Sequence, residues 1–253
     1  MFASAGAYDR HVGRYGAALS RAHIAAAGVR QGDRALDVGC GPGALTHALA
    51  ELLGADHVAA VDPSQPFVDA CRTRVPGADV RVGTGEALPH FGMSFDVVMS
   101  QLALNFMDDT VAAVRAMRAA ARAGATVTSC VWDYAGGMTM LRAFWDAALE
   151  LDPDAPDEGR TMRYCSPEEL RELWVDGGLA DVRTDAIHAD ADYVDFGDYW
   201  APFPTGLAPS GSYCASLDAR RQGALRDACF RRLGSPSGPF TLRARAWFVR
   251  GRA

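Results

Sequence analysis

The sequence predicts an α/β protein built on a doubly wound, mostly parallel sheet with helices on both faces. In the first half of the chain, strand-like and helix-like segments alternate, which is the pattern of such a sheet. Of the 253 residues, 49% are hydrophobic and 22% are charged, a composition that can bury one large core. We therefore expect a single domain over residues 1–253, with insertions in its less regular second half.

The elements of the first half follow from short apolar runs, which suit strands, and from longer runs with helical periodicity. In chain order we expect helix 8–27, strand 34–38, helix 44–53, strand 57–61, helix 65–74, strand 80–82, strand 95–99, helix 110–122 and strand 125–131. We expect residues 8–30 to form a lid made by the N-terminal helix. Residues 32–131 are expected to form the ligand-binding core.

The second half predicts fewer elements, separated by segments rich in proline and glycine. Ser166-Pro167-Glu168-Glu169 predicts a helix start, because serine caps helices, proline suits the first position and acids suit the first turn. We expect helix 138–149, loop 152–158, a helix from Ser166 to about Gly177, strand 182–187, helix 217–233 and strand 241–249. Residues 133–165 and 189–238 are predicted to be insertions.

Charge and composition argue against several classes of protein. The net charge is −6 and all 25 basic residues are scattered arginines, which argues against a nucleic-acid partner. No apolar run approaches the roughly 18–20 residues of a membrane span. The first residues contain no apolar signal region, so we expect a cytoplasmic protein without a membrane partner. The six cysteines form no CxxC pair, so we expect them to be reduced and expect no metal.

A glycine-rich turn follows the strand 34–38. It reads Gly39-Cys40-Gly41-Pro42-Gly43, and a helix begins directly after it. Glycine has no side chain and tolerates positive φ, so the backbone can turn sharply beneath a nucleotide. The alternative is a tight strand-to-helix turn without chemical significance.

Two later segments favour the nucleotide interpretation. Asp62 ends the second strand about 20 residues after the turn, where it can accept hydrogen bonds from both ribose hydroxyls. Alternatively Asp62-Pro63-Ser64 caps the next helix, and the two roles can coexist. After the third strand, Thr84-Gly85-Glu86-Ala87-Leu88-Pro89 lies where an adenine edge would meet backbone amides or an acid. The alternative for this segment is a surface loop with an exposed Glu86.

Together the LDVGCGPG turn (residues 36–43) and the E-x-LP segment (residues 86–89) resemble motifs of the class I S-adenosylmethionine-dependent methyltransferases that act on small molecules. The resemblance covers residues 8–131 with specific motifs and continues more weakly to the C-terminus. It implies a seven-stranded sheet in the order 3-2-1-4-5-7-6 with an antiparallel last strand. It also implies S-adenosyl-L-methionine as cofactor and in-line SN2 transfer of its methyl group to a small molecule.

The resemblance further implies which residues contact the cofactor. They are Gly39, Cys40, Gly41 and Gly43 in the turn beneath it, Asp37 at the methionine ammonium directly or through water, Asp62 at the ribose with Pro63 and Ser64 beside it, Thr84, Gly85 and Glu86 at the adenine, and Ser100, Gln101 and Leu102 at the methionine side. Thr84 stands where many members carry Asp or Asn, and Gly85 where they often carry Ala. We therefore expect the adenine contacts to come mainly from the backbone.

The methyl acceptor is expected at the carboxyl ends of the strands, where open α/β sheets bind ligands. Candidate contacts are Tyr8, Arg14 and Tyr15 in the N-terminal segment, Asn105 and Phe106 after the fourth strand, and Trp132 after the fifth. For each aromatic the alternative is ordinary packing. The two insertions are expected to form a substrate cap.

A general base is optional, because the sulfonium is already an activated methyl donor. The candidates for a catalytic residue are His11 and Asn105, and the family commonly has histidine at the second of these positions. We expect His23, His47 and His57 to be structural or surface residues.

Two other functions stay open from the residues. An NAD(P)-dependent oxidoreductase shares the strand–glycine–helix–acid plan. Against it, Asp37 stands two residues before the first glycine, where dinucleotide folds usually carry apolar residues, and Gly43 comes one position early for GxGxxG. A module that binds S-adenosylmethionine without transferring its methyl group would keep the same turn and acids. The sequence specifies neither the acceptor nor the oligomeric state.

Overall fold

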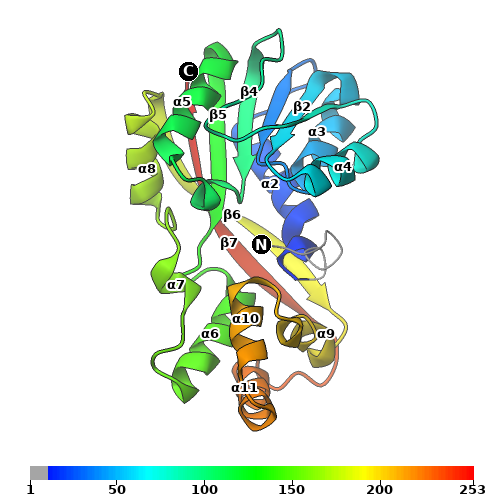
Figure 1. The fold of residues 1–253 in the computed structure, drawn as a ribbon, viewed down its shortest axis with the longest axis vertical. Coiled ribbons are helices and arrows are strands. Elements are labelled where there is room, and N and C mark those ends of the chain that lie inside the picture. Colours follow the sequence, from blue (N-terminus) through cyan, green and yellow to red (C-terminus); the bar gives the residue numbers. More distant parts are fainter. Residues whose placement is uncertain (1–10) are drawn as a thin grey trace. The chain divides into compact units, whose positions relative to one another are not determined.

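The structure of the protein is a computed structural model that describes residues 11–253 (Figure 1). Seven strands within this range form one sheet in the order β3-β2-β1-β4-β5-β7-β6. The first five pair in parallel with one another, and β7 runs antiparallel. The fold class and the strand order implied by the resemblance are therefore confirmed.

The elements alternate along the first half of the chain as predicted. The strands are β1 (Ala35–Val38), β2 (Val58–Asp62), β3 (Asp79–Val82), β4 (Phe95–Gln101), β5 (Ala121–Trp132), β6 (Ala180–Tyr193) and β7 (Phe240–Arg252). The α-helices are α2 (Gly16–Ala27), α3 (Ala44–Leu53), α4 (Gln65–Arg74), α5 (Thr110–Ala120), α6 (Thr139–Leu151), α7 (Glu158–Thr161), α8 (Pro167–Asp176), α9 (Phe196–Trp200), α10 (Ala208–Ser216) and α11 (Ala219–Arg232). Short 3-10 helices are η1 (Val12–Tyr15), η2 (Ala55–His57), η3 (Leu104–Phe106) and η4 (Phe203–Thr205).

The chain divides into two compact units. The core unit comprises Gly16–Val131, Tyr164–Ile187 and Ala246–Ala253. The insertion unit comprises the described residues up to Tyr15 together with Trp132–Arg163 and His188–Arg245. The two longer segments of the insertion unit have nearly the same sequence bounds as the predicted insertions, 133–165 and 189–238. The role of these segments as a substrate cap stays a prediction.

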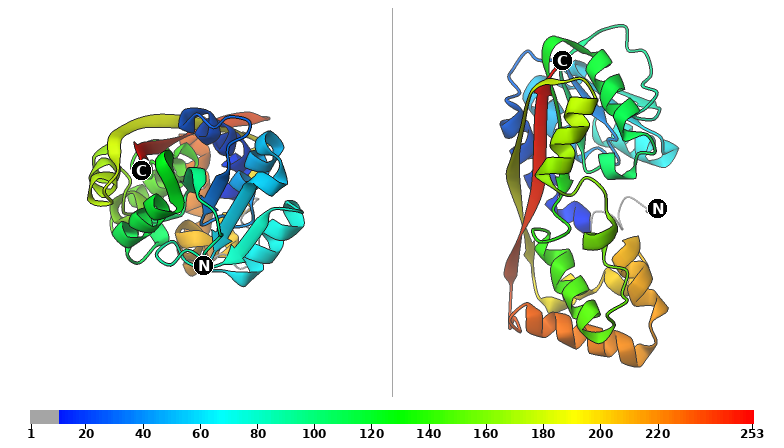
Figure 2. Two further views of the ribbon diagram at one scale, coloured as in Figure 1. Left: turned by 90° about the horizontal axis from the view of Figure 1, so that it is seen from above. Right: turned by 90° about the vertical axis from the view of Figure 1, so that its left-hand side faces the viewer.

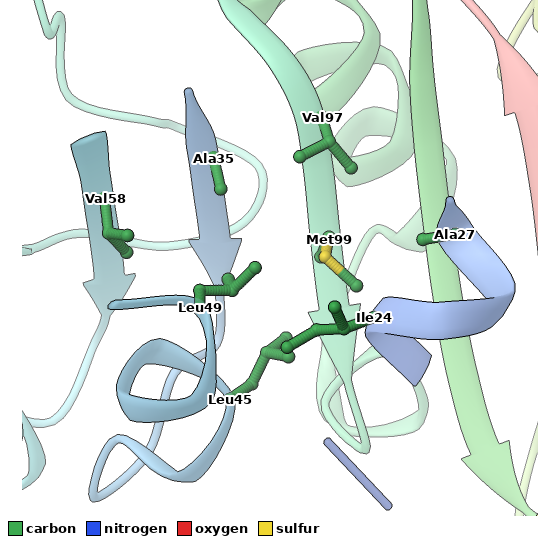
Figure 3. Close-up of a cluster of buried hydrophobic side chains, with 8 residues drawn as sticks. All are labelled: Ile24, Ala27, Ala35, Leu45, Leu49, Val58, Val97 and Met99. Carbon is green, nitrogen blue, oxygen red and sulfur yellow. The ribbon is translucent and has the colours of Figure 1, made fainter. Parts of the chain in front are cut away.

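In the core unit, α2, α3 and α4 cover one face of the sheet. The cluster drawn in Figure 3 joins α2 and α3 to β1, β2 and β4 and consists of Ile24, Ala27, Ala35, Leu45, Leu49, Val58, Val97 and Met99. A second cluster joins α4 to β2 and β3 and consists of Cys40, Ala60, Val68, Cys71 and Val80. Every second residue of a strand points to the same face, so Val58 and Ala60 place α3 and α4 on the same side.

Helices α5 and α8 cover the other face of the sheet in the core unit (Figure 2). Trp174 of α8 is fully buried, and its Nε1 donates to the Val127 carbonyl of β5 at 3.1 Å. Ser166 caps α8 by accepting from the Glu169 amide at 3.2 Å, as its sequence predicts. Arg115 of α5 donates to the Asp176 carbonyl at the end of α8, so the two helices are also joined by a hydrogen bond.

His23 attaches α2 to the sheet through buried hydrogen bonds. The Thr128 hydroxyl donates its only proton to the Val249 carbonyl at 2.8 Å, so it must accept from His23 Nε2 at 3.2 Å. His23 Nδ1 therefore carries no proton and accepts from the Cys130 thiol at 3.5 Å. The ring is a neutral Nε2–H tautomer, and burial lowers the pKa of His23 to about 4.

The buried His23 predicts a loss of stability in mild acid. Between the unfolded pKa of 6.5 and the folded pKa of about 4, only the unfolded chain takes up this proton. The free energy of unfolding should therefore fall with pH in this window, by roughly 2 kcal/mol from pH 6.5 to pH 5. Urea unfolding of the wild type and His23→Gln at both pH values isolates this contribution. Equal pH dependence of the two proteins would contradict it.

Raised carboxyl pKa values act in the opposite direction, so the comparison with His23→Gln is essential. Burial raises the pKa of Asp37 and of Glu158 to about 7. Each folded carboxyl keeps a proton that the unfolded chain has released, so its contribution to stability is lost as the pH rises from about 4 to about 7. Both proteins retain these acids, and their effect cancels in the difference.

The insertion unit has an aromatic core of its own. Phe144 of α6 stacks on Phe203 of η4, with ring centroids 4.4 Å apart. Tyr199 of α9 is buried, and its hydroxyl donates to the Met140 carbonyl at 3.0 Å. Buried aromatic rings contribute large hydrophobic area, and a buried tyrosine needs such a partner for its hydroxyl. The short helices of this unit therefore pack on α6.

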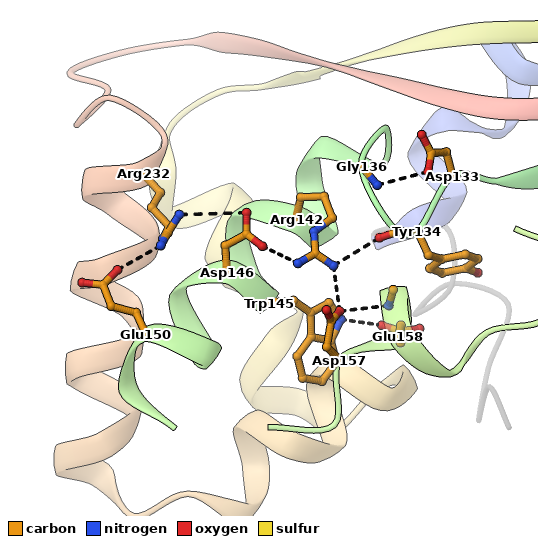
Figure 4. Close-up of polar contacts among 11 residues, drawn as sticks. Asp133, Tyr134, Gly136, Arg142, Trp145, Asp146, Glu150, Asp157, Glu158 and Arg232 are labelled. Atoms are coloured by element: carbon orange, nitrogen blue, oxygen red, sulfur yellow. Dashed lines mark hydrogen bonds and ion pairs between the residues drawn. The ribbon is translucent and has the colours of Figure 1, made fainter. Parts of the chain in front are cut away.

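Charged side chains in the insertion unit are paired around Arg142 (Figure 4). The guanidinium of Arg142 contacts Asp146 and lies 2.7 Å from Asp157 Oδ1. Trp145 Nε1 donates to Glu158 Oε2 at 2.9 Å. Buried charges need partners of this kind, because an unpaired ion in an apolar interior is strongly destabilising.

The structure corrects several predicted boundaries. Strand β6 continues to Tyr193, because small and apolar side chains keep alternating inward beyond the predicted end at Ile187, namely at Ala189, Ala191 and Tyr193. α5 ends at Ala120, and β5 starts earlier than predicted. Helices α7, α9 and α10 were not predicted, and the predicted helix 8–27 is α-helical only from Gly16 within the described residues. All six cysteines are free. None of the helices in residues 11–253 has the length and apolar character to span a bilayer.

Candidate active site

The glycine turn after β1 is attached to the end of β2. The Gly39 amide donates to the Val61 carbonyl at 2.8 Å. Gly39, Gly41 and Gly43 have φ values of +78°, +51° and +90°, which residues with a side chain rarely adopt. A Cβ at Gly39 would lie 2.4 Å from the Cβ of Ala103, whereas a Cβ at Gly41 would meet nothing within 4 Å. The turn is thus closely packed at Gly39 and open at Gly41.

Asp62, the last residue of β2, holds the same turn. Its Oδ2 accepts from the Gly41 amide and its Oδ1 from the Ser64 amide, both at 2.9 Å. Burial raises the pKa of Asp62, and these two amides oppose the shift. Each oxygen keeps capacity for a second hydrogen bond. The observed bond at the start of α4 therefore leaves the predicted ribose contact possible.

Asp37, on β1, is completely buried and only partly hydrogen-bonded. Its Oδ2 accepts from the Thr46 hydroxyl of α3 at 2.7 Å, and its Oδ1 has no hydrogen-bond partner. Burial raises the pKa of Asp37 to about 7, the Thr46 hydrogen bond lowers it, and the charge of Asp62 raises it. A buried acceptor without a partner costs free energy. Asp37 Oδ1 is therefore suited to a donor from a ligand.

The loop after β3 is held by hydrogen bonds of its own side chains. Glu86 Oε1 accepts from the two backbone amides of residues 108–109, at 3.1 and 3.4 Å, which fixes the start of α5. Thr84 is exposed, and its hydroxyl accepts from the Ala87 amide at 3.2 Å. A Cβ at Gly85 would lie 2.7 Å from Met107 Sδ, so glycine here leaves room for that methionine.

The end of β4 combines buried polar groups with a strained backbone. Ser100 is completely buried, and its hydroxyl has no partner. Gln101 Nε2 donates to the Ser20 hydroxyl of α2 at 2.9 Å. Leu102 has a left-handed φ of +59°, and its amide donates to the Cys130 carbonyl at 2.9 Å. Such a conformation costs roughly 1–2 kcal/mol for a residue with a side chain and is typical of functional sites.

At position 102 glycine should be more stable than alanine, the reverse of the usual order. Both substitutions remove the leucine side chain, but only glycine relieves the left-handed backbone. We expect the free energy of unfolding of Leu102→Gly to exceed that of Leu102→Ala by about 1 kcal/mol in urea unfolding. A more stable alanine variant would show that this backbone strain is absent in solution.

Comparisons with known proteins agree with this geometry. Residues 35–124 match a family model described as a methyltransferase domain. An uncharacterised methyltransferase of Schizosaccharomyces pombe is 26% identical over 156 residues, which are 53% of this chain and 55% of that protein. The demethylmenaquinone methyltransferase of Roseiflexus castenholzii is 30% identical over 169 residues, which are 59% of this chain and 68% of that protein. The chain belongs to the class I S-adenosylmethionine-dependent methyltransferases.

A solved structure shares the fold of this methyltransferase. It is a putative methyltransferase from an antibiotic biosynthesis pathway of Anabaena variabilis, with a TM-score of 0.59 and 19% identity over 93% of this chain and 96% of that chain. The chain spans just over half the length of its fission yeast relative. The cofactor of the family is S-adenosylmethionine, and the comparisons give the oxidoreductase alternative no support.

The residues around the turn fit the cofactor of a methyltransferase. The backbone at Gly41 is open to the close approach of a nucleoside. Asp62 keeps acceptor capacity for hydroxyl donors, and Asp37 Oδ1 is an acceptor that lacks a partner. S-adenosylmethionine carries both kinds of donor, on its ribose and on its ammonium group. The individual contacts stay predictions.

Two predicted acceptor contacts of the methyltransferase lie in the core unit, on η3 just after β4. Asn105 is 7% exposed, whereas Phe106 is 60% exposed. An exposed phenylalanine beside the end of a strand offers apolar surface to a ligand. Phe106 is therefore not buried in the core of this unit, and its contact with an acceptor stays a prediction.

Tyr15 and Trp132, two other predicted contacts, lie together in the insertion unit. Tyr15 is completely buried, its hydroxyl is 3.3 Å from the Tyr193 hydroxyl, and its ring meets Trp132 edge-on at 5.7 Å. These contacts are those of aromatic side chains packed in a core. They agree with ordinary packing, the alternative to an acceptor contact that the sequence left open for each aromatic. Trp132 Nε1 is buried without a hydrogen-bond partner, so this ring keeps a donor for a ligand.

The polar candidates of the N-terminal segment are engaged within the insertion unit. Arg14 contacts the Asp198 carboxylate at 3.0 and 3.1 Å and lies 4.2 Å from the centre of the Tyr193 ring. His11 is buried beside Phe203, and burial lowers its pKa to about 4. A histidine with this pKa is a weak base at neutral pH. Tyr8 lies outside the described residues.

Sequence reasoning missed two residues that hold predicted contacts in place. Thr46 donates to Asp37, and Ser20 donates to the Gly16 carbonyl while accepting from Gln101. Both are completely buried on helices whose inward faces are otherwise mainly apolar. A hydroxyl residue on the apolar face of a helix was the available signal.

Proposed function

We propose that the protein transfers the methyl group of S-adenosyl-L-methionine to a small molecule by in-line SN2 displacement. The bound cofactor supplies an activated methyl group. The task of the chain is to hold an acceptor nucleophile in line with the methyl–sulfur bond and to exclude water. A general base is needed only when the acceptor must lose a proton.

The observation that carries the proposal is the buried, unpaired Oδ1 of Asp37, two residues before a turn whose backbone is open at Gly41. An ammonium group supplies donors to such an oxygen, in a charge-assisted hydrogen bond. A dinucleotide would instead bring pyrophosphate to the turn, and a carboxylate beside it would repel that charge. The Asp37 carboxylate thus favours an amino-acid-bearing nucleoside.

In this proposal the cofactor is held mainly by backbone and carboxylates. The proposed contacts are Gly39, Cys40, Gly41 and Gly43 beneath the cofactor, Asp37 at the ammonium, Asp62 with Pro63 and Ser64 at the ribose, Thr84, Gly85 and Glu86 at the adenine, and Ser100, Gln101 and Leu102 at the methionine side. Because Glu86 Oε1 already accepts two amides, backbone groups of this loop are the main adenine contacts.

The proposed acceptor is a small molecule with apolar or aromatic surface. The net charge of −6 disfavours a nucleic-acid acceptor. In the core unit, the exposed Phe106 and the neighbouring Asn105 are proposed to contact the acceptor. In the insertion unit we propose Trp132 as the contact, because its indole N–H favours an acceptor that bears an oxygen, with Tyr15 packed against its ring and Arg14 against Tyr193 to support it.

The proposal is tested in two steps. Isothermal titration calorimetry with S-adenosylhomocysteine, and separately with NADH, identifies the ligand of the glycine turn. Transfer of a tritiated methyl group from S-adenosylmethionine to a panel of phenols, amines, thiols and carboxylates then tests for catalysis.

The outcomes separate the three functions considered. Binding of S-adenosylhomocysteine with transfer to a panel compound supports the methyltransferase. Binding of this ligand without transfer to any class of acceptor favours the non-catalytic module. Binding of NADH alone would overturn the proposal in favour of an oxidoreductase.

A further inference from the structure

Thr46 is placed to control the orientation of the Asp37 carboxylate. It is the third residue of α3 and is completely buried, like Asp37 itself. Its hydroxyl lies 2.7 Å from Asp37 Oδ2. The carboxylate of Asp37 has no proton to give when it is ionised, so the threonine must be the donor.

This arrangement leaves the two oxygens of Asp37 unequal. Oδ2 is occupied by Thr46, whereas Oδ1 is buried and has no partner. Without the hydroxyl, the carboxylate would lose its side-chain hydrogen bond and keep only the backbone interaction with Thr46, so Oδ1 would be presented to a ligand less firmly. Preorganised acceptors of this kind bind a charged group more tightly than mobile ones.

We propose that Thr46 is a positioning residue that fixes Asp37 with Oδ1 available to the ammonium group of the ligand. The inference rests on the proposed function, because it takes the ligand to carry an amino-acid ammonium beside the nucleoside. It adds to that function a residue on the buried face of α3 that touches no part of the ligand itself.

The hydrogen bond from Thr46 also bears on the ionisation of Asp37. Burial raises the pKa of Asp37 to about 7, the Asp62 charge raises it, and the Thr46 hydrogen bond lowers it. The other titratable groups that interact with Asp37 are the thiols of Cys40, Cys71 and Cys130. An ammonium group prefers the ionised carboxylate, so ligand affinity should rise as the pH increases through the pKa of Asp37. Removing the hydroxyl should move this rise to higher pH.

The test is calorimetric binding of S-adenosylhomocysteine from pH 6 to pH 8.5 to the wild type, Thr46→Val, Thr46→Ser and Asp37→Asn. Valine keeps the shape of threonine without its hydroxyl, and serine restores the hydroxyl. We expect Thr46→Val to weaken binding about tenfold at pH 7 and to shift the rise in affinity to higher pH. Thr46→Ser should behave as the wild type.

A second probe separates positioning from a structural role. 5′-Methylthioadenosine has the nucleoside but lacks the amino-acid group, so its affinity should be the same for the wild type and Thr46→Val at every pH. Equal weakening of both ligands by Thr46→Val, or an unchanged pH dependence for S-adenosylhomocysteine, would overturn the role of Thr46. If Asp37→Asn binds S-adenosylhomocysteine as tightly as the wild type, the result instead contradicts the proposed contact between Asp37 and the ammonium group.

Discussion

Replacing Gly39 with alanine is expected to lower the free energy of unfolding by about 3 kcal/mol. The backbone at this position has a φ of +78°, and a new Cβ would lie 2.4 Å from the Cβ of Ala103. The left-handed conformation costs roughly 1–2 kcal/mol, and forcing a methyl group against its neighbour adds about 1–3 kcal/mol. Urea unfolding measures the loss.

Gly41→Ala is the matched control, because it lies in the same turn with a different environment. Its φ is +51°, and a Cβ there would meet nothing within 4 Å, so only the conformational cost of roughly 1–2 kcal/mol applies. The methyl group would occupy the space that the proposed cofactor approaches. We therefore expect Gly41→Ala to weaken S-adenosylhomocysteine binding about a hundredfold in calorimetry. If instead the two variants lose equal stability, the result contradicts the steric contact predicted between a Cβ at position 39 and Ala103.

Asp62→Ala is expected to have the largest effect on cofactor affinity. It removes the proposed acceptor of the ribose hydroxyls and also the partner of the Gly41 and Ser64 amides, which hold the turn. Hydrogen bonds to a charged group are each worth about 1.5–3 kcal/mol, so affinity for S-adenosylhomocysteine should fall by about a hundredfold or more. Isothermal titration calorimetry gives the dissociation constant.

Two controls make the Asp62 experiment specific. Asp62→Asn keeps the shape and one acceptor oxygen, so it should lose less affinity than alanine. Asp69→Ala removes an exposed acid from α4, the helix that follows Asp62, and should leave binding unchanged. An unaltered dissociation constant for Asp62→Ala would remove this carboxylate from the cofactor site.

The core of the site was predictable because its signals are local. The glycine turn needs positive φ at fixed positions, and Asp62 follows a strand whose end is readable from its apolar residues. Helices α3 and α4 were predicted with their observed bounds for a similar reason: each begins directly after a turn or a proline-containing cap. These features depend on a few neighbouring residues.

What the sequence did not reveal depends on contacts between distant segments. The bond from Thr46 to Asp37 requires α3 to lie against β1, and Gln101 meets Ser20 only once α2 packs beside β4. The left-handed Leu102 carries no local signal, because its conformation is stabilised by the Cys130 carbonyl of the next strand. Strand β6 was cut short in the prediction because alanines mark its buried face only weakly.

The attachments of the glycine turn to Val61 and Asp62 have a kinetic consequence. Both are hydrogen bonds within the chain itself, so the loop is held by its own contacts and gives up little conformational freedom when a nucleoside binds. The association rate of a nucleoside at the glycine turn should then be limited by its diffusion to the site rather than by rearrangement of the chain. Differences in affinity among nucleoside analogues should accordingly appear in their dissociation rates.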